Sequence, residues 1–188
     1  MPRYFIWTIG CQMNKSESQR IASYLGSIGY QAAIMVRDAD LVVLNTCVVR
    51  QNAEDKVLGT LGLLKGLKKE RPNISILVTG CFVDSNIEGL RRRFPQVDFF
   101  FKPGAYSELM GWIKEEQGIS TAEQGMGLPI PSPPSPCVFV PIIQGCNNFC
   151  SYCIVPYRRG RERSRPVEEI AGEVKELVHR GAKEVTLL

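Results

Sequence analysis

Residues 74–81 read ISILVTGC, and this stretch decides the fold together with two similar ones, YFIWTIGC at residues 4–11 and LVVLNTC at residues 41–47. Each stretch is short, apolar and rich in β-branched or aromatic residues, which is typical of a strand buried on both faces of a sheet. Each also ends in a cysteine. The repetition predicts three equivalent strands whose carboxyl ends carry the same side chain.

Helical patterns separate the apolar runs. Ile21, Leu25 and Ile28 fall on one face of a helix. Ser16 and Gln19 have the spacing of a capping box, so we expect this helix to begin near Ser16. A second helical face, which ends before Pro72, consists of Val57, Leu61 and Leu64.

The alternation of strands and helices predicts an α/β fold. Such sequences build mostly parallel sheets with helices on both faces. The nearest template is a five-stranded, flavodoxin-like sheet in the strand order 2-1-3-4-5. The strands that we expect are Tyr4–Ile9, Ala32–Val36, Leu41–Asn45, Ile74–Thr79 and Asp98–Phe101.

Changes in composition divide the chain into three parts. Residues 1–117 contain the complete five-strand pattern, and we expect them to form one domain. Residues 118–136 are rich in glycine, polar residues and proline, with five of the twelve prolines between Pro129 and Pro136. This composition predicts an extended, stiff linker. Residues 137–188 then begin a second domain.

The second domain is expected to hold one β-loop-α-β unit. Its strand covers Val138–Gln144, a long loop runs to Ser164, and a helix with Pro166 in its first turn leads to a strand at Glu184–Leu188. One such unit cannot bury both faces of its strands, so we expect a longer protein in which this domain continues. The predicted apolar face of the helix consists of Val167, Ile170, Ala171, Val174, Leu177 and Val178.

The composition excludes several classes of protein. The 188 residues are 44% hydrophobic and carry a net charge of +4, which fits a globular protein and only weakly favours a polyanionic partner. No stretch reaches the ~18–20 apolar residues of a membrane span, and the first residues lack the features of a signal peptide. We therefore expect a cytoplasmic protein without membrane contact. In that compartment seven cysteines are more typical of metal ligands or reactive thiols than of disulfides.

Three of the cysteines lie close together at residues 145–153, which read GCNNFCSYC. Thiolates on one short loop can each bind a different iron of a cubane cluster and leave the fourth iron open to another ligand. Zinc is one alternative, but it needs a fourth ligand, and the lone histidine, His179, is better explained as a cation at a helix end. A thioredoxin-like pair of Cys150 and Cys153 is the other alternative. The candidate cluster ligands are Cys146, Cys150 and Cys153.

Three further cysteines are dispersed along the chain. Cys11, Cys47 and Cys81 each follow a predicted strand, and those strands are neighbours in the predicted sheet. Neighbouring strands lie ~4.8 Å apart, so the three side chains are expected within roughly 10 Å of each other, at the edge where open sheets bind ligands. Each also precedes a helix, whose N-terminal amides favour a thiolate. We expect a shared metal site, with three separate buried thiols as the alternative. Cys137 is expected to be a structural or incidental thiol without a partner.

These motifs resemble those of a known enzyme family. The cysteine spacing of residues 146–153, with Tyr152 before the last cysteine, is similar to the radical S-adenosylmethionine (SAM) signature. The stretches YFIWTIGCQMN at residues 4–14, NTCVVR at residues 45–50 and VTGC at residues 78–81 resemble the cluster-binding domain of the radical SAM methylthiotransferases. In that family the cluster-binding domain precedes a radical SAM domain, as it does here.

The resemblance implies two [4Fe–4S] clusters. The open iron of the first binds SAM, whose adenine Tyr152 helps to position, and the reduced cluster cleaves SAM to a 5′-deoxyadenosyl radical. The open iron of the second carries the sulfur to be transferred. The family continues with the rest of a (β/α) barrel and an RNA-binding β-barrel, so we expect this stretch alone to be inactive. The implied ligands are Cys146, Cys150 and Cys153 for the first cluster and Cys11, Cys47 and Cys81 for the second.

Residues 45–57 and 144–162 look most like the MiaB-type branch of the family. That branch converts N6-isopentenyladenosine beside the tRNA anticodon to its 2-methylthio derivative. Alternatives are methylthiotransferases of threonylcarbamoyladenosine in tRNA or of a ribosomal protein aspartate, a non-catalytic metal-containing RNA-binding module, and an iron–sulfur electron carrier. The resemblance implies a tRNA substrate, an electron donor such as a flavodoxin or ferredoxin, and a sulfur donor. We expect a monomer.

A run of arginines follows the second cysteine motif. We expect Arg158, Arg161 and Arg165 to contact SAM or the substrate, because arginine forks suit phosphates and carboxylates. The alternative is a solvated loop whose arginines pair with acids of the following helix. The whole run consists of Arg158, Arg159, Arg161, Arg163 and Arg165.

Overall fold

The computed structural model describes residues 1–49, 51–118, 130–131 and 136–188. The predicted linker at residues 118–136 lies largely outside these residues, so its extended form stays a prediction. Within the described ranges, no helix combines the length and the apolar character that crossing a membrane requires.

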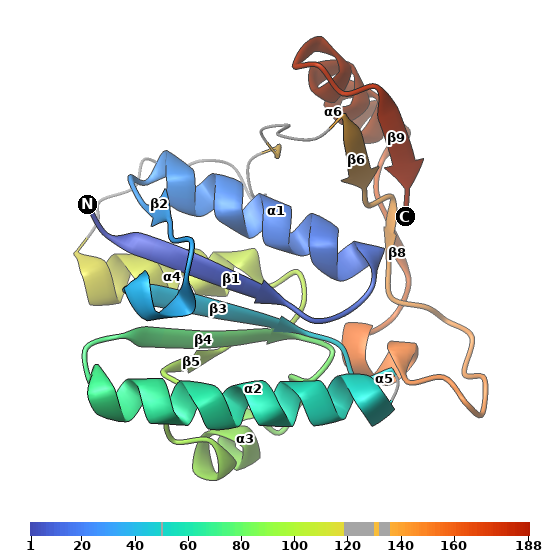
Figure 1. Cartoon of the computed structure of the whole chain (residues 1–188). Coiled ribbons are helices and arrows are strands. Elements are labelled where there is room, and N and C mark those ends of the chain that lie inside the picture. The colour runs from blue at the N-terminus through green and yellow to red at the C-terminus, as the bar shows by residue number, and fades with distance from the viewer. Residues whose placement is uncertain (50, 119–129, 132–135) are drawn as a thin grey trace.

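A five-stranded sheet forms the centre of the N-terminal part (Figure 1). Its strands are β1 (Arg3–Thr8), β2 (Gln31–Ala32), β3 (Leu41–Thr46), β4 (Ser75–Gly80) and β5 (Phe99–Phe100). Their order in the sheet is β2-β1-β3-β4-β5, and all neighbours pair in parallel. This result confirms the flavodoxin-like order predicted from the alternating pattern.

Helices cover both faces of this sheet. They are α1 (Gln12–Ser27), α2 (Gln51–Glu70), α3 (Ile87–Arg93) and α4 (Tyr106–Gln117). Alternate side chains of β3 point to opposite faces, so Leu41 and Val43 pack with α1 and α4, whereas Val42 and Leu44 pack with α2 and α3. The predicted faces of the first two helices are confirmed, because the structure buries Ile21, Leu25, Val57, Leu61 and Leu64.

The predicted start of α1 is wrong. The helix begins directly after Cys11, its N-cap, one turn before Ser16. The Asn14 Oδ1 atom accepts a hydrogen bond from the Cys11 amide at 3.2 Å, so this pair has the role expected of Ser16 and Gln19. Ser16 is buried inside the helix and donates to the carbonyl oxygen of Phe139 at 3.1 Å.

The second predicted strand is shorter than expected. Residues 32–36 were expected to be extended, but β2 ends at Ala32 and a 3-10 turn covers Val36–Asp38. Ile34 and Met35 between them are 93% and 48% exposed. β2 lies at the edge of the sheet, and within this run only Ala33 and Val36 pack against the core.

The C-terminal part contains β6 (Cys137–Val140), β7 (Ile143–Gln144), α5 (Val155–Arg159), β8 (Arg163–Ser164), α6 (Val167–His179) and β9 (Glu184–Leu187). The prediction of one strand over Val138–Gln144 is wrong, because β6 stops before Pro141, which has no amide hydrogen for a strand ladder. β6 pairs in parallel with β9, while β7 pairs antiparallel with β8. Helix α5 was not predicted, since five residues are too few to show helical periodicity.

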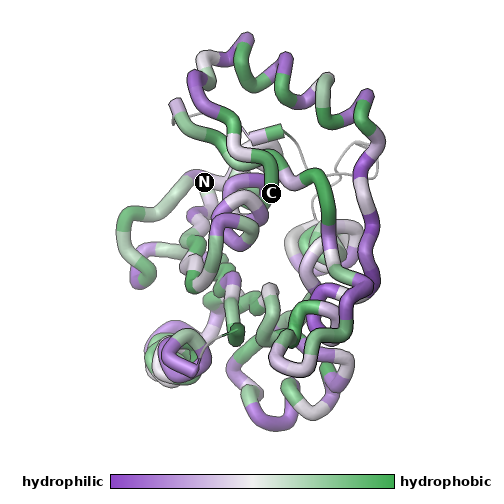
Figure 2. The backbone as a smooth tube through the Cα atoms, turned by 90° about the vertical axis from the view of Figure 1, so that its right-hand side faces the viewer, coloured by the Kyte–Doolittle hydropathy of each residue, from purple (hydrophilic) through white to green (hydrophobic). Residues whose placement is uncertain are grey.

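Helix α6 buries a narrower stripe than predicted. Leu177 is fully buried and packs with Val138 and Val140 of β6, while Ile170 and Val174 are partly buried against them. Three members of the predicted face are exposed, namely Val167, Ala171 and Val178. The alternation of apolar and polar positions along this helix is visible at the top of Figure 2. Among the apolar residues of α6, only those above β6 and β9 pack against other described residues.

Candidate metal centres at the carboxyl edge of the sheet

Three cysteines lie at the carboxyl ends of adjacent strands. Cys47 directly follows β3 and Cys81 directly follows β4, whereas Cys11 follows the turn after β1. The parallel register aligns the ends of these strands, with Thr46 of β3 opposite Gly80 of β4 and Thr8 of β1 opposite the preceding residue of β3. Cys47 and Cys81 are 7% and 3% exposed, while Cys11 is exposed. All three cysteines therefore follow the ends of adjacent strands at the same edge of the sheet, as predicted, while their shared metal site stays a prediction.

Glycines allow the three cysteine-bearing segments to approach each other closely. A Cβ atom on Gly10 would lie 2.9 Å from the Cβ atom of Cys47. A Cβ atom on Gly80 would lie 2.1 Å from the carbonyl oxygen of Thr46, and Gly80 has a φ of +94°. Larger residues at either position would force the segments apart, so both glycines allow the close packing of the segments that carry the cysteines.

A buried asparagine network fixes the turn that carries Cys11. Asn14 donates through Nδ2 to Asn45 Oδ1 at 2.8 Å and to the carbonyl oxygen of Thr46 at 3.0 Å. Asn45 donates in return to the carbonyl oxygen of Asn14 at 2.9 Å and to Ser18 Oγ at 3.0 Å. Both asparagines are 0% exposed. The network joins the start of α1 to the end of β3, and the sequence analysis did not find it.

The other three candidate ligands lie on the loop between β7 and α5. The Cys146 amide donates to the carbonyl oxygen of Gly160 at 3.1 Å, and the Cys153 amide donates to that of Cys150 at 3.0 Å. Gly145, with a φ of +78°, is packed so tightly that a Cβ atom would lie 2.3 Å from the carbonyl oxygen of Arg161. Cys150 is exposed, and the other two cysteines are partly exposed. The loop thus closes on itself and presents its thiols toward solvent.

Both sets of cysteines have the chemistry of iron–sulfur ligands. None of the seven cysteines forms a disulfide, and soft thiolates suit iron–sulfur clusters. Among the residues that the structure describes, no three His, Cys, Asp or Glu side chains are placed to hold one metal ion. In a cubane cluster each thiolate binds a different iron. Each set of three thiols therefore has the donor type of such a cluster.

Comparison with known protein families gives two separate matches along the chain. Residues 3–102 match Uncharacterized protein family UPF0004, which is more than half of the chain. The chain belongs to this family. Residues 140–188 match the radical SAM superfamily. We call these two stretches the UPF0004 unit and the radical SAM unit.

Relatives align along the whole chain. One from Dehalococcoides mccartyi is 48% identical over 188 residues, which are 100% of this chain and 42% of the relative. Others from Chloroflexus aurantiacus and Herpetosiphon aurantiacus are 45% and 44% identical and cover 99% of this chain, but only 40% and 42% of the relatives. All three are named tRNA-2-methylthio-N(6)-dimethylallyladenosine synthase. The chain thus spans less than half the length of these relatives, and its predicted resemblance to the methylthiotransferases is confirmed.

The remaining predicted site residues have different environments. Tyr152 is 90% exposed, so in this structure its ring is available to a ligand and packs on little of the protein. His179 is the last residue of α6, as expected. The prediction that Cys137 has no partner is wrong, because its thiol lies 3.5 Å from Glu184 Oε2.

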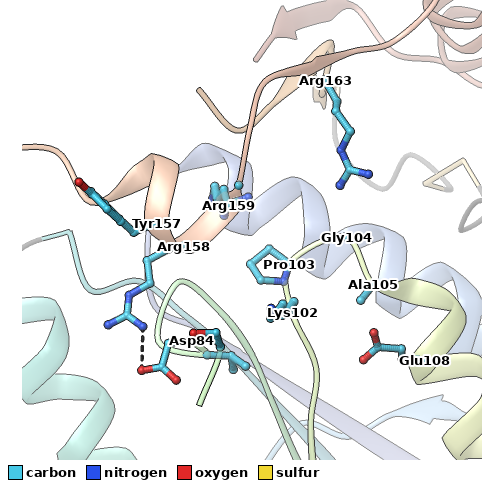
Figure 3. Close-up of a pocket in the computed structure, with 13 residues that line it drawn as sticks. Asp84, Lys102, Pro103, Gly104, Ala105, Glu108, Tyr157, Arg158, Arg159 and Arg163 are labelled. Carbon is cyan, nitrogen blue, oxygen red and sulfur yellow. Dashed lines mark ion pairs between the residues drawn. The ribbon is translucent and has the colours of Figure 1, made fainter. Parts of the chain in front are cut away.

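The arginine run divides into paired and exposed members. Arg158 pairs with Asp84 of the UPF0004 unit at 3.0 Å (Figure 3). Arg165 pairs with Glu173 of α6 at 2.7 Å, which is the arrangement expected of a loop paired with the following helix. Arg161 and Arg163 are exposed and form no ion pair with any described residue. Of the three predicted contact residues, Arg161 is therefore the best placed to meet an external anion.

Arg159 is the most buried member of the run, and the sequence analysis assigned it no function. Its guanidinium pairs with Glu17 of α1 at 2.6 Å and lies near enough to the Cys81 thiol for the two groups to influence each other's pKa. Burial raises the pKa of the Cys81 thiol, and Arg159 opposes this shift. Burial also lowers the pKa of Arg159, but the charge of Glu17 and the contact with Cys81 outweigh it and raise that pKa. The guanidinium therefore stays charged beside a candidate ligand.

A pocket of about 410 Å³ lies where α5 and β8 meet the loops that follow β4 and β5. Figure 3 shows Lys102, Arg163 and Glu108 around it, together with the Arg158–Asp84 pair. The Arg158–Asp84 pair is internally neutral, and Arg159, which also lines the pocket, pairs with Glu17. The two remaining cations outnumber the one remaining acid. The pocket can therefore accept an anionic group such as a phosphate.

Proposed function

We propose that the chain is the N-terminal part of a tRNA methylthiotransferase. The complete enzyme replaces the hydrogen on C2 of N6-isopentenyladenosine, beside the anticodon, with a methylthio group. One observation supports this proposal most. The chain has two separate cysteine triads, and helix α5, which follows the second triad, pairs its Arg159 with Glu17 of α1, the helix that begins directly after Cys11 of the first. The names of the aligned relatives describe the same product.

Each triad has a distinct task in this proposal. Both would hold [4Fe–4S] clusters, which together with SAM supply the radical and the sulfur when bound. The chain itself holds the ligands in place through the asparagine network and the closed loop, and the exposed Tyr152 would receive the adenine of SAM. The N-terminal ligands are Cys11, Cys47 and Cys81, and the C-terminal ligands are Cys146, Cys150 and Cys153.

The domain division belongs to the same proposal. Residues 1–117 would form the cluster-binding domain, residues 118–136 the linker, and residues 137–188 the start of the radical SAM domain. The complete sheet and its four covering helices end at Gln117, which supports the first boundary. The second domain, in contrast, has one β6–α6–β9 unit in the described structure.

The compartment, the oligomeric state and the partners of the enzyme belong to the same proposal. We propose a cytoplasmic monomer that takes electrons from a carrier such as a flavodoxin or ferredoxin and sulfur from a separate donor. Seven cysteines without a disulfide agree with a reducing compartment. Arg161 and Arg163, both exposed, together with Lys102 at the pocket, would contact the phosphates of the tRNA.

The division of labour between the triads provides the test. In the full-length protein, Cys150→Ala should abolish reductive cleavage of SAM. Cys47→Ala should still form 5′-deoxyadenosine but no methylthiolated tRNA, and Cys137→Ala is the matched control that should form both. Chromatography of both products from one reaction with isopentenylated tRNA gives the answer. Normal methylthiolation by Cys47→Ala would mean that the N-terminal cysteines are structural thiols.

A further inference from the structure

Helix α1 has a second buried face, and this face is polar. Its apolar side chains pack on the sheet, whereas Ser16, Glu17 and Arg20 contact the C-terminal part of the chain, which lies on the other side of α1 (Figure 1). Ser16 and Glu17 are 0% and 5% exposed. Charged side chains are rarely buried unless they are paired, so this face of α1 requires partners from the radical SAM unit.

Two ion pairs of opposite polarity cross this face. The Arg159 guanidinium donates to both carboxylate oxygens of Glu17, at 2.6 and 3.3 Å. One turn further along α1, Arg20 pairs with Glu173 of α6. The four side chains are between 3% and 12% exposed. Each unit thus supplies one acid and one cation to the same buried interface.

This order of charges favours one register of the two units. If the radical SAM unit moved by one turn toward the C-terminal end of α1, Arg159 would face Arg20. If it moved by one turn in the other direction, Glu173 would face Glu17. Like charges that face each other away from water are strongly unfavourable, and charge patterns of this kind fix register more than they add affinity.

We propose that four charged side chains hold the two units in this one register and are positioning residues for the reaction, namely Glu17, Arg20, Arg159 and Glu173. Helix α1 begins directly after Cys11, and α5, which ends at Arg159, begins two residues after Cys153. The pair of Glu17 and Arg159 therefore joins the helices that follow the two cysteine triads, and the register fixes the separation of the triads. Its value for the reaction rests on the proposed function, in which both triads serve one substrate.

Distances between two spin labels test the register in the metal-free chain. Ile34 lies beyond the C-terminal end of α1 and Val167 begins α6, and they are 93% and 74% exposed. A nitroxide-bearing non-natural amino acid replaces each of them, and pulsed electron paramagnetic resonance measures their separation. We expect one narrow distance in the labelled parent chain.

Two variants should lose the single register. They are Arg20→Met and the double variant Glu17→Met with Arg159→Met. Each removes the like-charge contact that opposes one direction of movement, so we expect a second population displaced by up to about 5 Å, one helical turn. Neither leaves a buried charge unpaired, because in the first Glu173 keeps Arg165 as its partner at 2.7 Å. Their melting temperatures should therefore stay close to that of the parent chain.

Two controls separate movement of the units from local effects. Arg180→Met breaks an ion pair within α6, between Arg180 and Glu176, and should keep the single distance. Labels at Ile34 and Leu63, which both belong to the UPF0004 unit, should give the parent distance in every variant.

A purely structural role would lower the melting temperatures and leave the distance between the units unchanged. A single parental distance in either variant would overturn the inference, and so would a broad distribution in the labelled parent chain. If the double variant fails to fold, Arg20→Met decides. A reconstituted chain that binds no iron would instead refute the proposed function, and the label distances do not depend on that result.

Discussion

Replacing Asn45 by alanine tests whether the buried asparagine network holds the N-terminal site together. The Asn45 side chain accepts one hydrogen bond from Asn14 and donates two, to the Asn14 carbonyl oxygen and to Ser18 Oγ. Each buried hydrogen bond contributes about 1 kcal/mol net, so the substitution should lower the free energy of unfolding by about 3 kcal/mol. Larger losses are not expected, because Asn14 keeps its bond to Thr46 and Ser18 keeps its bond to Thr8.

Urea denaturation of the metal-free chain, followed by circular dichroism, measures this loss. Asn73→Ala is the matched control, because Asn73 lies exposed in the turn before β4 and surface substitutions usually change stability by less than about 0.5 kcal/mol. The two variants should have the same slope against urea if unfolding exposes the same surface. An Asn45→Ala protein as stable as Asn73→Ala would refute the idea that the network fixes the Cys11 turn.

Three further predictions concern the ion pair between Arg159 and Glu17, the first domain and the binding of tRNA. Arg159→Met should destabilise the metal-free chain by about 3–5 kcal/mol in urea, because Glu17 loses its buried partner; a loss below 1 kcal/mol would contradict this. Residues 1–117 should unfold cooperatively and bind one cluster by themselves, and a molten, aggregating product would count against that boundary. In the full-length protein, Arg161→Ala and Arg163→Ala should each weaken tRNA binding and lower the slope of log K against log salt by about 1; unchanged slopes would exclude phosphate contacts.

The sheet and the convergence of its cysteines were predictable because both depend on local patterns. Apolar runs that alternate with amphipathic helices determine a parallel sheet, and the order of strands then places Cys47 and Cys81 side by side. The start of α1 was missed because two capping signals overlap. Asn14 lies three residues after Cys11, and Gln19 lies three residues after Ser16, so spacing alone does not distinguish them.

Long-range ion pairs could not be predicted in the same way. Glu17 is one of 19 acidic residues, and its burial becomes apparent only when α5 packs against α1. The same holds for Asp84, which pairs with Arg158, whereas the pairing of Arg165 with the next helix was foreseen as an alternative. The break at Pro141, in contrast, was predictable from the sequence, because proline interrupts a strand ladder. The expected strand over Val138–Gln144 nevertheless ran through it.

Metal analysis of the anaerobically reconstituted chain tests the central claim most directly. Two clusters predict about eight irons per chain, and a single ligand substitution in either triad should leave about four. Cys47→Ala and Cys150→Ala therefore each lose half of the iron, whereas Cys137→Ala retains all of it. One tightly bound zinc with little iron, or full iron retention by Cys47→Ala, would contradict the account.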